Sequence, residues 1–226
     1  MALVNSTLAG GSMPSRFLYF VVRNFLWLLM LVWLRVRVTG RHNVPASGAF
    51  ILAPIHRSAV DIPLASLAVH RRVRFMGKDS LWKKRPIGVF LSALGGFPVT
   101  RGSADLEALK RCIAVLANGE PLVMFPEGTR QFGPQVHPLF DGPAYVALKA
   151  GVPIVPVGIG GSEHVMSKGS RSIRSQRCRV VVAAPIYPPD TAGKAPRDIV
   201  AGLTAELSDS LQRAFDQARR DARTSY

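Results

Sequence analysis

The chain has 226 residues, 48% of them hydrophobic, so it can bury one ordinary core and is not an intrinsically disordered chain. Its 29 lysines and arginines outnumber its 14 acidic residues. The resulting net charge of +15 favours polyanionic partners: nucleic acid, anionic lipid head groups or a phosphorylated ligand. The two cysteines, Cys112 and Cys178, exclude a disulfide framework and a zinc site, and we expect Cys112 to pack on the apolar side of a helix.

The N-terminal segment is strongly apolar over residues 17–34. As a helix it would extend about 27 Å, slightly less than the roughly 30 Å hydrocarbon core of a bilayer. Arg23 and Asn24 interrupt it, and Arg35 follows where a signal peptide would have a small-residue cleavage site. We predict that residues 1–35 form a membrane-anchoring segment, monotopic or peripheral, at the cytoplasmic face of the cell membrane; a buried core helix is the alternative. The arginines that we expect to reach anionic head groups are Arg16, Arg23, Arg35 and Arg37.

Short β-branched runs alternate with helical patterns through residues 36–226. Several runs are almost continuously apolar, as in strands that are covered on both faces. The alternation predicts an α/β domain with a mixed, mostly parallel sheet flanked by helices. We expect strands at residues 36–39, 49–53, 73–77, 121–125, 154–158 and 179–183.

Two helices are predicted from apolar residues at helical spacing. One is capped by Ser103 and ends before Gly119. The other is C-terminal, and we expect it to dock on the sheet, with a partner or membrane helix as the alternative. Its apolar stripe is made of Ile199, Leu203, Leu207, Leu211 and Phe215. Residues 161–178 are predicted to form an exposed basic loop, and the proline-rich residues 187–196 a connection.

Residues 53–61 contain a histidine and an aspartate at the end of a predicted strand. His56 follows the strand directly, and Asp61 precedes Ile62 and Pro63, which is typical of a helix start. On one helix, residues five apart point about 140° away from each other, but across a strand-to-helix turn they can pair. An aspartate on one imidazole nitrogen raises the basicity of the other, as in a catalytic triad. The alternative is a turn histidine beside a helix-capping aspartate.

The sequence has no G-x-S-x-G elbow and no convincing cysteine nucleophile. A histidine–aspartate pair without its own nucleophile suits a reaction in which a substrate hydroxyl attacks.

A second polar cluster follows another predicted buried strand, at the end where ligands bind in open α/β sheets. Gly128 permits close backbone approach, Thr129 offers a hydroxyl, and Arg130 can bind a phosphate with two N–H groups. We expect Glu127 to orient that arginine or to hold a substrate hydroxyl. Arg101 follows a glycine-rich turn at residues 95–96.

In this order, the motifs resemble those of the glycerolphosphate acyltransferase family, which includes bacterial 1-acylglycerol-3-phosphate acyltransferases. His56 and Asp61 match the family's H-x(4)-D motif, and residues 125–130 match its F-P-E-G-T-R motif. The other two matching blocks are residues 78–101 and 152–157. The resemblance extends over residues 36–185. The chain departs from it at Ile55, where many lysophosphatidate enzymes carry asparagine, and at Gln131, where many carry serine. These departures bear on the acceptor and its acylated position.

The resemblance implies an O-acyltransferase of phospholipid synthesis. His56 would take the proton from a hydroxyl of 1-acylglycerol 3-phosphate or glycerol 3-phosphate, and Asp61 would steady the imidazolium. Lys78, Arg101 and Arg130 would hold the acceptor phosphate. The acyl donor would be acyl-CoA or acyl carrier protein, with no cofactor and no metal. The acyl chain would lie along parts of residues 60–69 and 80–94.

Two other classes of protein compete with the enzyme. A non-catalytic basic peripheral membrane protein that binds anionic lipids would explain the charge and the apolar segment equally well. It would not explain why His56, Asp61, Glu127 and Arg130 all follow strand ends. Nucleic-acid binding is not expected, because no known reader motif occurs. The remaining histidines show no metal-ligand spacing: His42, His70, His137 and His164.

Overall fold

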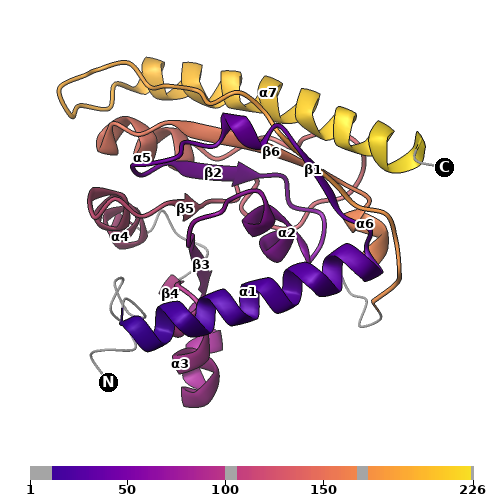
Figure 1. Ribbon diagram of the computed structural model, residues 1–226. Helices are drawn as coiled ribbons and strands as arrows, with labels where there is room; N and C mark the ends of the chain where they lie inside the picture. Colours follow the sequence, from indigo (N-terminus) through magenta and orange to yellow (C-terminus); the bar gives the residue numbers. More distant parts are fainter. Residues whose placement is uncertain (1–11, 100–105, 167–172, 225–226) are drawn as a thin grey trace.

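The computed structural model describes residues 12–99, 106–166 and 173–224, which form an α/β fold (Figure 1). The strands are β1 (Arg37–Thr39), β2 (Ile51–Pro54), β3 (Arg74–Lys78), β4 (Gly96–Val99), β5 (Leu122–Val123), β6 (Ile154–Gly160) and β7 (Arg179–Val182). The α-helices are α1 (Met13–Trp33), α2 (Asp61–Leu67), α3 (Arg85–Ala93), α4 (Leu106–Ala117), α5 (Gly142–Ala150), α6 (Ser162–Val165) and α7 (Arg197–Thr224). Two 3₁₀ helices are η1 (Arg41–Asn43) and η2 (Asp79–Lys83).

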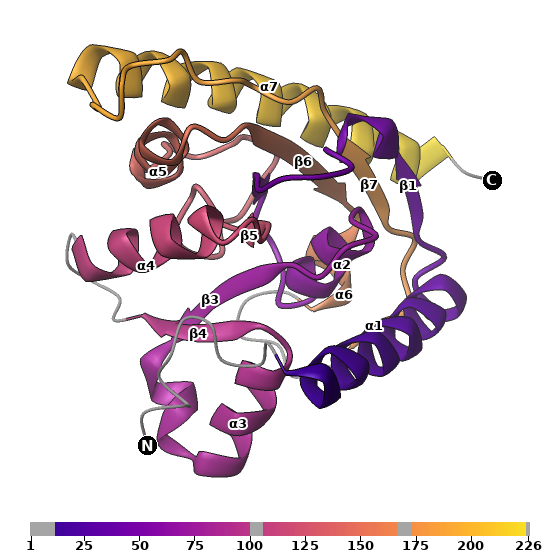
Figure 2. The same cartoon turned by 60° about the vertical axis from the view of Figure 1, so that its left-hand side comes forward.

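The strands form one sheet in the order β1-β7-β6-β2-β5-β3-β4. Only the β6–β7 pair is antiparallel among the described strands, so the prediction of a mixed, mostly parallel sheet is confirmed. Helices α4, α5 and α7 cover one face, and α1 and α2 lie on the other (Figures 1 and 2). Successive strand residues point to opposite faces. Ile51 therefore packs with the first set of helices, and Leu52 with the second.

Helix α7 is docked on the sheet, as its apolar stripe predicts. Leu207, Leu211 and Phe215 are buried in the cores. The helix comes so close to β6 that a Cβ atom at Gly158 would lie 2.2 Å from the Ala214 backbone. A glycine is required there, because any side chain would push the helix off the strand.

Two predictions differ from the structure. Strand β4 is absent from the predicted strands because Gly95 and Gly96 indicate a turn; Gly96 instead begins a strand that pairs with β3 at the edge of the described sheet. Part of the predicted exposed loop at residues 161–178 is instead buried: α6 forms there, and Ser162 and Cys178 are inaccessible. The predicted cap at Ser103 lies outside the described residues, whereas the helix ends near Gly119 as expected.

Helix α1 rests on the domain with one face and exposes an apolar face. The Tyr19 hydroxyl accepts the Val73 N–H at 3.2 Å, and Arg23 donates to the Val69 carbonyl at 2.6 Å. Arg23 therefore faces the protein, and the prediction that it reaches anionic head groups is wrong. The alternative of a buried core helix is wrong, and α1 is long and apolar enough to cross a membrane by length and composition. Its exposed apolar residues are Met13, Phe17, Phe20, Val21, Phe25, Trp27, Leu28, Leu29, Leu31, Val32 and Trp33.

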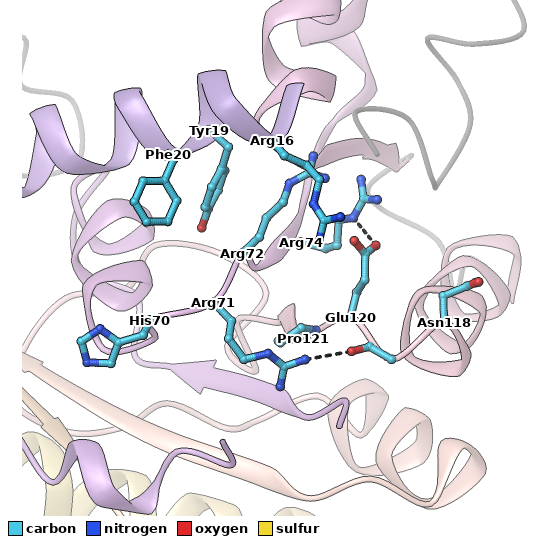
Figure 3. A pocket seen from close by; sticks show the side chains of 11 residues that line it. Arg16, Tyr19, Phe20, His70, Arg71, Arg72, Arg74, Asn118, Glu120 and Pro121 are labelled. Atoms are coloured by element: carbon cyan, nitrogen blue, oxygen red, sulfur yellow. Dashed lines mark hydrogen bonds and ion pairs between the residues drawn. The ribbon is translucent and has the colours of Figure 1, made fainter. Parts of the chain in front are cut away.

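Cavities lie beside α1 at both ends of the sheet. An apolar one of about 520 Å³ lies between α1 and the residues that precede α2. A smaller apolar one of about 160 Å³ lies farther along α1, next to Phe75 and Val123. A third, of about 610 Å³, is lined by arginines at the N-terminal ends of β3 and β5 (Figure 3).

Candidate active site

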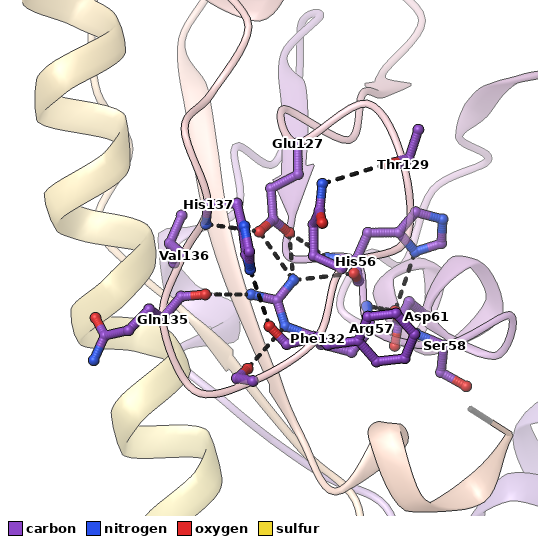
Figure 4. Close-up of polar contacts among 12 residues, drawn as sticks. His56, Arg57, Ser58, Asp61, Glu127, Thr129, Phe132, Gln135, Val136 and His137 are labelled. Carbon is purple, nitrogen blue, oxygen red and sulfur yellow. Dashed lines mark hydrogen bonds and ion pairs between the residues drawn. The ribbon is translucent and has the colours of Figure 1, made fainter. Parts of the chain in front are cut away.

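The His56 and Asp61 side chains meet across the turn between β2 and α2 (Figure 4). The imidazole Nδ1 lies 3.2 Å from the Asp61 Oδ2, and the histidine is 8% exposed while the aspartate is fully buried. The pairing predicted from their spacing is confirmed. A proton on Nδ1 would be held by the carboxylate and would leave a lone pair on Nε2, to which no described residue hydrogen-bonds. This is the arrangement of a general base.

Backbone groups and an aromatic ring fix this pair in place. The Asp61 Oδ2 accepts the N–H groups of Arg57 and Ser58, each at 2.6 Å. These bonds hold the carboxylate in its buried position. On the other side, the imidazole stacks on Phe125, with ring centroids 4.1 Å apart and planes at 29°. The orientation of the ring is therefore set by the carboxylate at one edge and by Phe125 on one face.

The loop after β5 clamps the backbone of the histidine. Strands β2 and β5 are parallel neighbours, with Leu52 opposite Val123, so His56 and Glu127 each lie four residues beyond paired positions. The His56 N–H donates to the Glu127 Oε2 at 3.1 Å. The Gln131 N–H donates to the His56 carbonyl at 2.9 Å. The two motifs thus meet through backbone bonds that do not depend on a ligand.

Glu127 contacts a different arginine from the one expected. Its carboxylate binds Arg57, whose Nη1 lies 2.7 Å from Oε2 and 2.9 Å from Oε1, and not its near neighbour Arg130. Glu127 is 1% exposed and Arg57 2% exposed. The carboxylate also accepts the His137 N–H at 3.1 Å, so both of its oxygens are filled by the protein. The expected contact with Arg130 is therefore corrected.

Arg57 is a site residue that the sequence interpretation missed. Its guanidinium lies 5.1 Å from the centre of the Phe215 ring. It also donates to three carbonyl oxygens, those of His56, Gly133 and Gln135, at 3.0, 3.2 and 2.8 Å. The available signal was a basic residue shortly after one buried strand, with an acidic residue one register position away after a second strand.

The remaining predicted residues differ in exposure. Gly128 has φ +68°, and a Cβ atom there would lie 2.7 Å from the Phe140 ring, so only glycine fits. Thr129 is exposed, and its hydroxyl accepts the Gln131 side-chain amide at 3.3 Å. Arg130 is half-buried, and Lys78 is exposed at the C-terminal end of β3. Because β2, β5 and β3 are adjacent and parallel, these residues share one edge of the sheet. Arg101 lies outside the described residues.

The apolar cavity of about 520 Å³ adjoins this edge. Ala59 and Val60, from the turn that carries His56 and Asp61, line it together with Met166, Ile173 and residues of α1. Val60 belongs to the segment in which we expected the acyl-chain wall. From the other expected segment, residues 80–94, Leu94 lines the smaller apolar cavity.

Neither cysteine has the properties of a nucleophile. Cys112 and Cys178 are both fully buried. Burial raises the pKa of Cys178 to about 12, and the nearby carboxylates of Asp61 and Glu163 add to this effect. Such a thiol stays protonated and inaccessible at neutral pH. Within residues 12–99, 106–166 and 173–224, no three His, Cys, Asp or Glu side chains form a candidate metal site.

Comparisons with known proteins agree with this geometry. The 1-acyl-sn-glycerol-3-phosphate acyltransferase of Bacillus subtilis is 26% identical over 78% of the chain and 86% of its own length. The chloroplastic enzyme of the same name from Brassica napus is 28% identical over 76% of the chain, which spans about half of that relative. The crystal structure of the 1-acyl-sn-glycerophosphate acyltransferase of Thermotoga maritima superposes with a TM-score of 0.77 at 26% identity, covering 94% of this chain and 83% of that one. The family model described as Acyltransferase matches residues 35–160, more than half of the chain, and the chain therefore belongs to the acyltransferase family.

Proposed function

We propose that the protein transfers a fatty acyl group from an acyl thioester to the free hydroxyl of 1-acylglycerol 3-phosphate, forming phosphatidate. The observation that carries the proposal is the buried pair in which Asp61 holds Nδ1 of His56 and leaves Nε2 open. The acceptor is supported by the names of the relatives from Bacillus subtilis and Thermotoga maritima. Glycerol 3-phosphate is the alternative acceptor, and the donor is acyl-CoA or acyl carrier protein.

His56 acts as the general base. Its Nε2 removes the proton from the acceptor hydroxyl as that oxygen attacks the carbonyl carbon of the thioester. Asp61 stabilises the imidazolium through the Nδ1–H bond. A tetrahedral oxyanion forms and then collapses. The carbon–sulfur bond breaks, and the imidazolium returns its proton to the departing sulfur. No acyl-enzyme is needed, because the nucleophile belongs to the acceptor.

The phosphate of the acceptor is bound by basic residues at the same edge of the sheet. Thr129 is exposed and Arg130 half-buried there, and the oxygens of Glu127 are occupied by protein donors. Lys78 and Arg101 complete the phosphate site. Holding the phosphate places the hydroxyl beside His56, which is itself a large part of catalysis. The acyl chain of one substrate occupies the apolar cavity beside Val60.

The exposed face of α1 lies in the membrane interface. Aromatic residues on this face favour the water–lipid boundary, and the net charge of +15 attracts anionic head groups at the cytoplasmic face of the cell membrane. This placement brings the site to its lipid acceptor. A non-catalytic lipid-binding protein would have the same charge and the same α1, but it would leave the buried His56–Asp61 pair without a role.

The test is acceptor-dependent release of thiol from acyl-CoA. We expect wild-type protein to release thiol with 1-acylglycerol 3-phosphate, His56→Ala to release none, and Asp61→Asn to be slower by roughly 10²–10⁴-fold. His42→Ala, at an exposed position, is the matched control and should retain full activity. Near-normal turnover by the His56 variant would refute its assignment as the base. Wild-type protein that binds lipid but releases no thiol with any acceptor or donor would favour the non-catalytic alternative.

A further inference from the structure

The cavity lined by arginines lies at the opposite end of the strands from His56 (Figure 3). Its volume is about 610 Å³. It is formed where α1 passes the starts of β3 and β5, whereas the proposed active site follows the ends of β2 and β5. Arg16, Tyr19 and Phe20 line it from α1. Residues 70–72, 74 and 118–121 line it at the starts of β3 and β5. The proposed acyl transfer does not use this cavity.

Positive charge dominates the cavity. The arginines that line it are Arg16, Arg71, Arg72 and Arg74, whereas Glu120 is the one acidic residue among the described lining residues. Glu120 is already paired with Arg74, at 2.5 Å. Arg71 donates to the Gly48 and Gly119 carbonyls, which fix its position without neutralising its charge. The cavity therefore keeps a net positive charge, which favours an anion.

Arg72 has charged donors that the described residues leave unpaired. Its guanidinium lies over the Tyr19 ring, 5.6 Å from the centre, and Nη2 donates to the Ala93 carbonyl at 3.1 Å. Its Nε and Nη1 are buried and have no hydrogen-bond partner among the described residues. Burial lowers the pKa of Arg72, and the neighbouring charges of Arg74 and Arg16 do so further. A buried guanidinium with unpaired donors is unfavourable, so an anion in the adjoining cavity would compensate its charge.

The cavity adjoins the exposed apolar face of α1. Phe20 lines the cavity and is also 55% exposed on that face. If α1 lies in the membrane interface, the mouth of the cavity is at the level of the lipid head groups. Arginine forks match the geometry of phosphate oxygens.

We propose that this cavity binds the phosphate group of an anionic phospholipid head group, at a site separate from the active site. The inference rests on the proposed membrane placement of α1, but not on the chemistry of His56. A bound phosphate would hold the N-terminal half of α1 at the membrane surface through Arg16 and Arg72.

The experiment measures binding of the full-length protein to vesicles of phosphatidylcholine, with and without phosphatidylglycerol. The variants are Arg16→Gln, Arg16→Gln/Arg72→Gln, and the matched control Arg197→Gln/Arg213→Gln. The control removes the same charge from exposed positions of α7, across the sheet from α1 (Figure 1). We expect the cavity double variant to bind anionic vesicles roughly 10- to 30-fold more weakly, as for the loss of two arginines near an anionic surface. The control should lose much less, and binding to neutral vesicles should not change in any variant.

Three results would overturn the proposal. Equal losses in the cavity and control variants would indicate general charge attraction. Unchanged binding of the cavity double variant to anionic vesicles would show that the cavity binds no lipid. If inorganic phosphate raises the unfolding temperature of the wild type but not of the double variant, while vesicle binding is equal, the ligand is a soluble phosphate instead of a lipid. If the double variant unfolds, the Arg16→Gln variant still tests the proposal, because Arg16 is exposed on α1 and its replacement should not affect folding. On a logarithmic scale, its affinity for anionic vesicles should decrease by about half as much as we expect for the double variant.

Acyl transfer separates this proposal from the proposed function. In detergent micelles with soluble assay components, we expect the cavity double variant to retain wild-type turnover, because the cavity is remote from His56. Failure of the lipid site would appear as unchanged vesicle binding with normal turnover. Failure of the proposed function would appear as absent turnover in the wild type, whatever the vesicles show.

Discussion

Replacing Glu127 by glutamine would test how the two motifs are held together. The change keeps the shape of the side chain but removes the charge that pairs with Arg57 inside the protein. Removing one partner of a buried ion pair costs about 3–5 kcal/mol, because the other charge stays buried without compensation. The amide also places N–H donors against the Arg57 guanidinium. For a domain of this size, that loss corresponds to a decrease in unfolding temperature of roughly 6–20 °C.

Thermal unfolding and steady-state kinetics would be measured together on the same preparations. Glu107→Gln is the matched control, since Glu107 pairs with Lys110 on the surface of α4, and we expect no measurable change in its stability. In Glu127→Gln the His56 N–H loses an acceptor, and a shift of about 1 Å in a catalytic group can reduce the rate by about 10²-fold. Because the carboxylate contacts only protein, the loss should appear in kcat, with KM for the acceptor nearly unchanged.

A different pattern would refute this reasoning. Unchanged stability with a raised acceptor KM would mean that Glu127 holds the acceptor hydroxyl, as its place in the sequence first indicated. The double variant Arg57→Met/Glu127→Gln provides a further check. If the two side chains act as a pair, the stability losses of the single variants should not add, since the second change removes the unpaired charge that the first one leaves.

Three further predictions concern the phosphate site, α1 and the cysteines. Arg130→Ala should raise KM for the acceptor and spare that of the thioester; the reverse would assign Arg130 to the donor. Phe25→Asn/Val32→Asn, on the exposed face of α1, should weaken binding to neutral vesicles by tenfold or more, since each apolar side chain contributes about 1.5–3 kcal/mol on burial; unchanged binding would place α1 outside the lipid. At pH 8 neither Cys112 nor Cys178 should react with a thiol reagent until the protein unfolds, because both are buried and Cys178 stays protonated in the folded state. Above about pH 9 the unfolded chain ionises Cys178 while the folded chain does not, so stability should decrease as pH rises toward 12.

The sequence predicted the central strands because their residue types follow from burial. Strand β6 is buried along its whole length, and only apolar residues and glycine can occupy such positions. Strand β4 escaped prediction because Gly95 and Gly96 indicate a turn, and only pairing with β3 reveals that a strand begins at Gly96. The exposed face of α1 was predictable in composition, but the orientation of Arg23 toward the Val69 carbonyl depends on a contact 46 residues away.

The site was predictable where it is local in sequence. His56 and Asp61 lie in one turn, so their spacing allowed a pair, and the other motifs favoured it over a turn histidine beside a capping aspartate. The partner of Glu127 depends instead on β5 lying beside β2, although β3, α3, β4 and α4 intervene along the chain. Without the strand order, the nearest arginine in sequence was the natural choice. Arg57 was missed for the same reason, since its role arises only when two strand ends are adjacent.

Burial also determines what the departures from the family pattern can affect. Ile55 stands where many lysophosphatidate enzymes carry asparagine. Its side chain is fully buried in the core, and its N–H donates to the Val157 carbonyl. Gln131 replaces serine, but it holds His56 through its backbone N–H, which any residue except proline supplies. Neither change therefore disturbs the clamp on the base. Of these two side chains, that of Gln131 bonds to the exposed Thr129 hydroxyl in the proposed acceptor site. Preference for the acceptor should therefore respond to Gln131→Ser and not to Ile55→Asn.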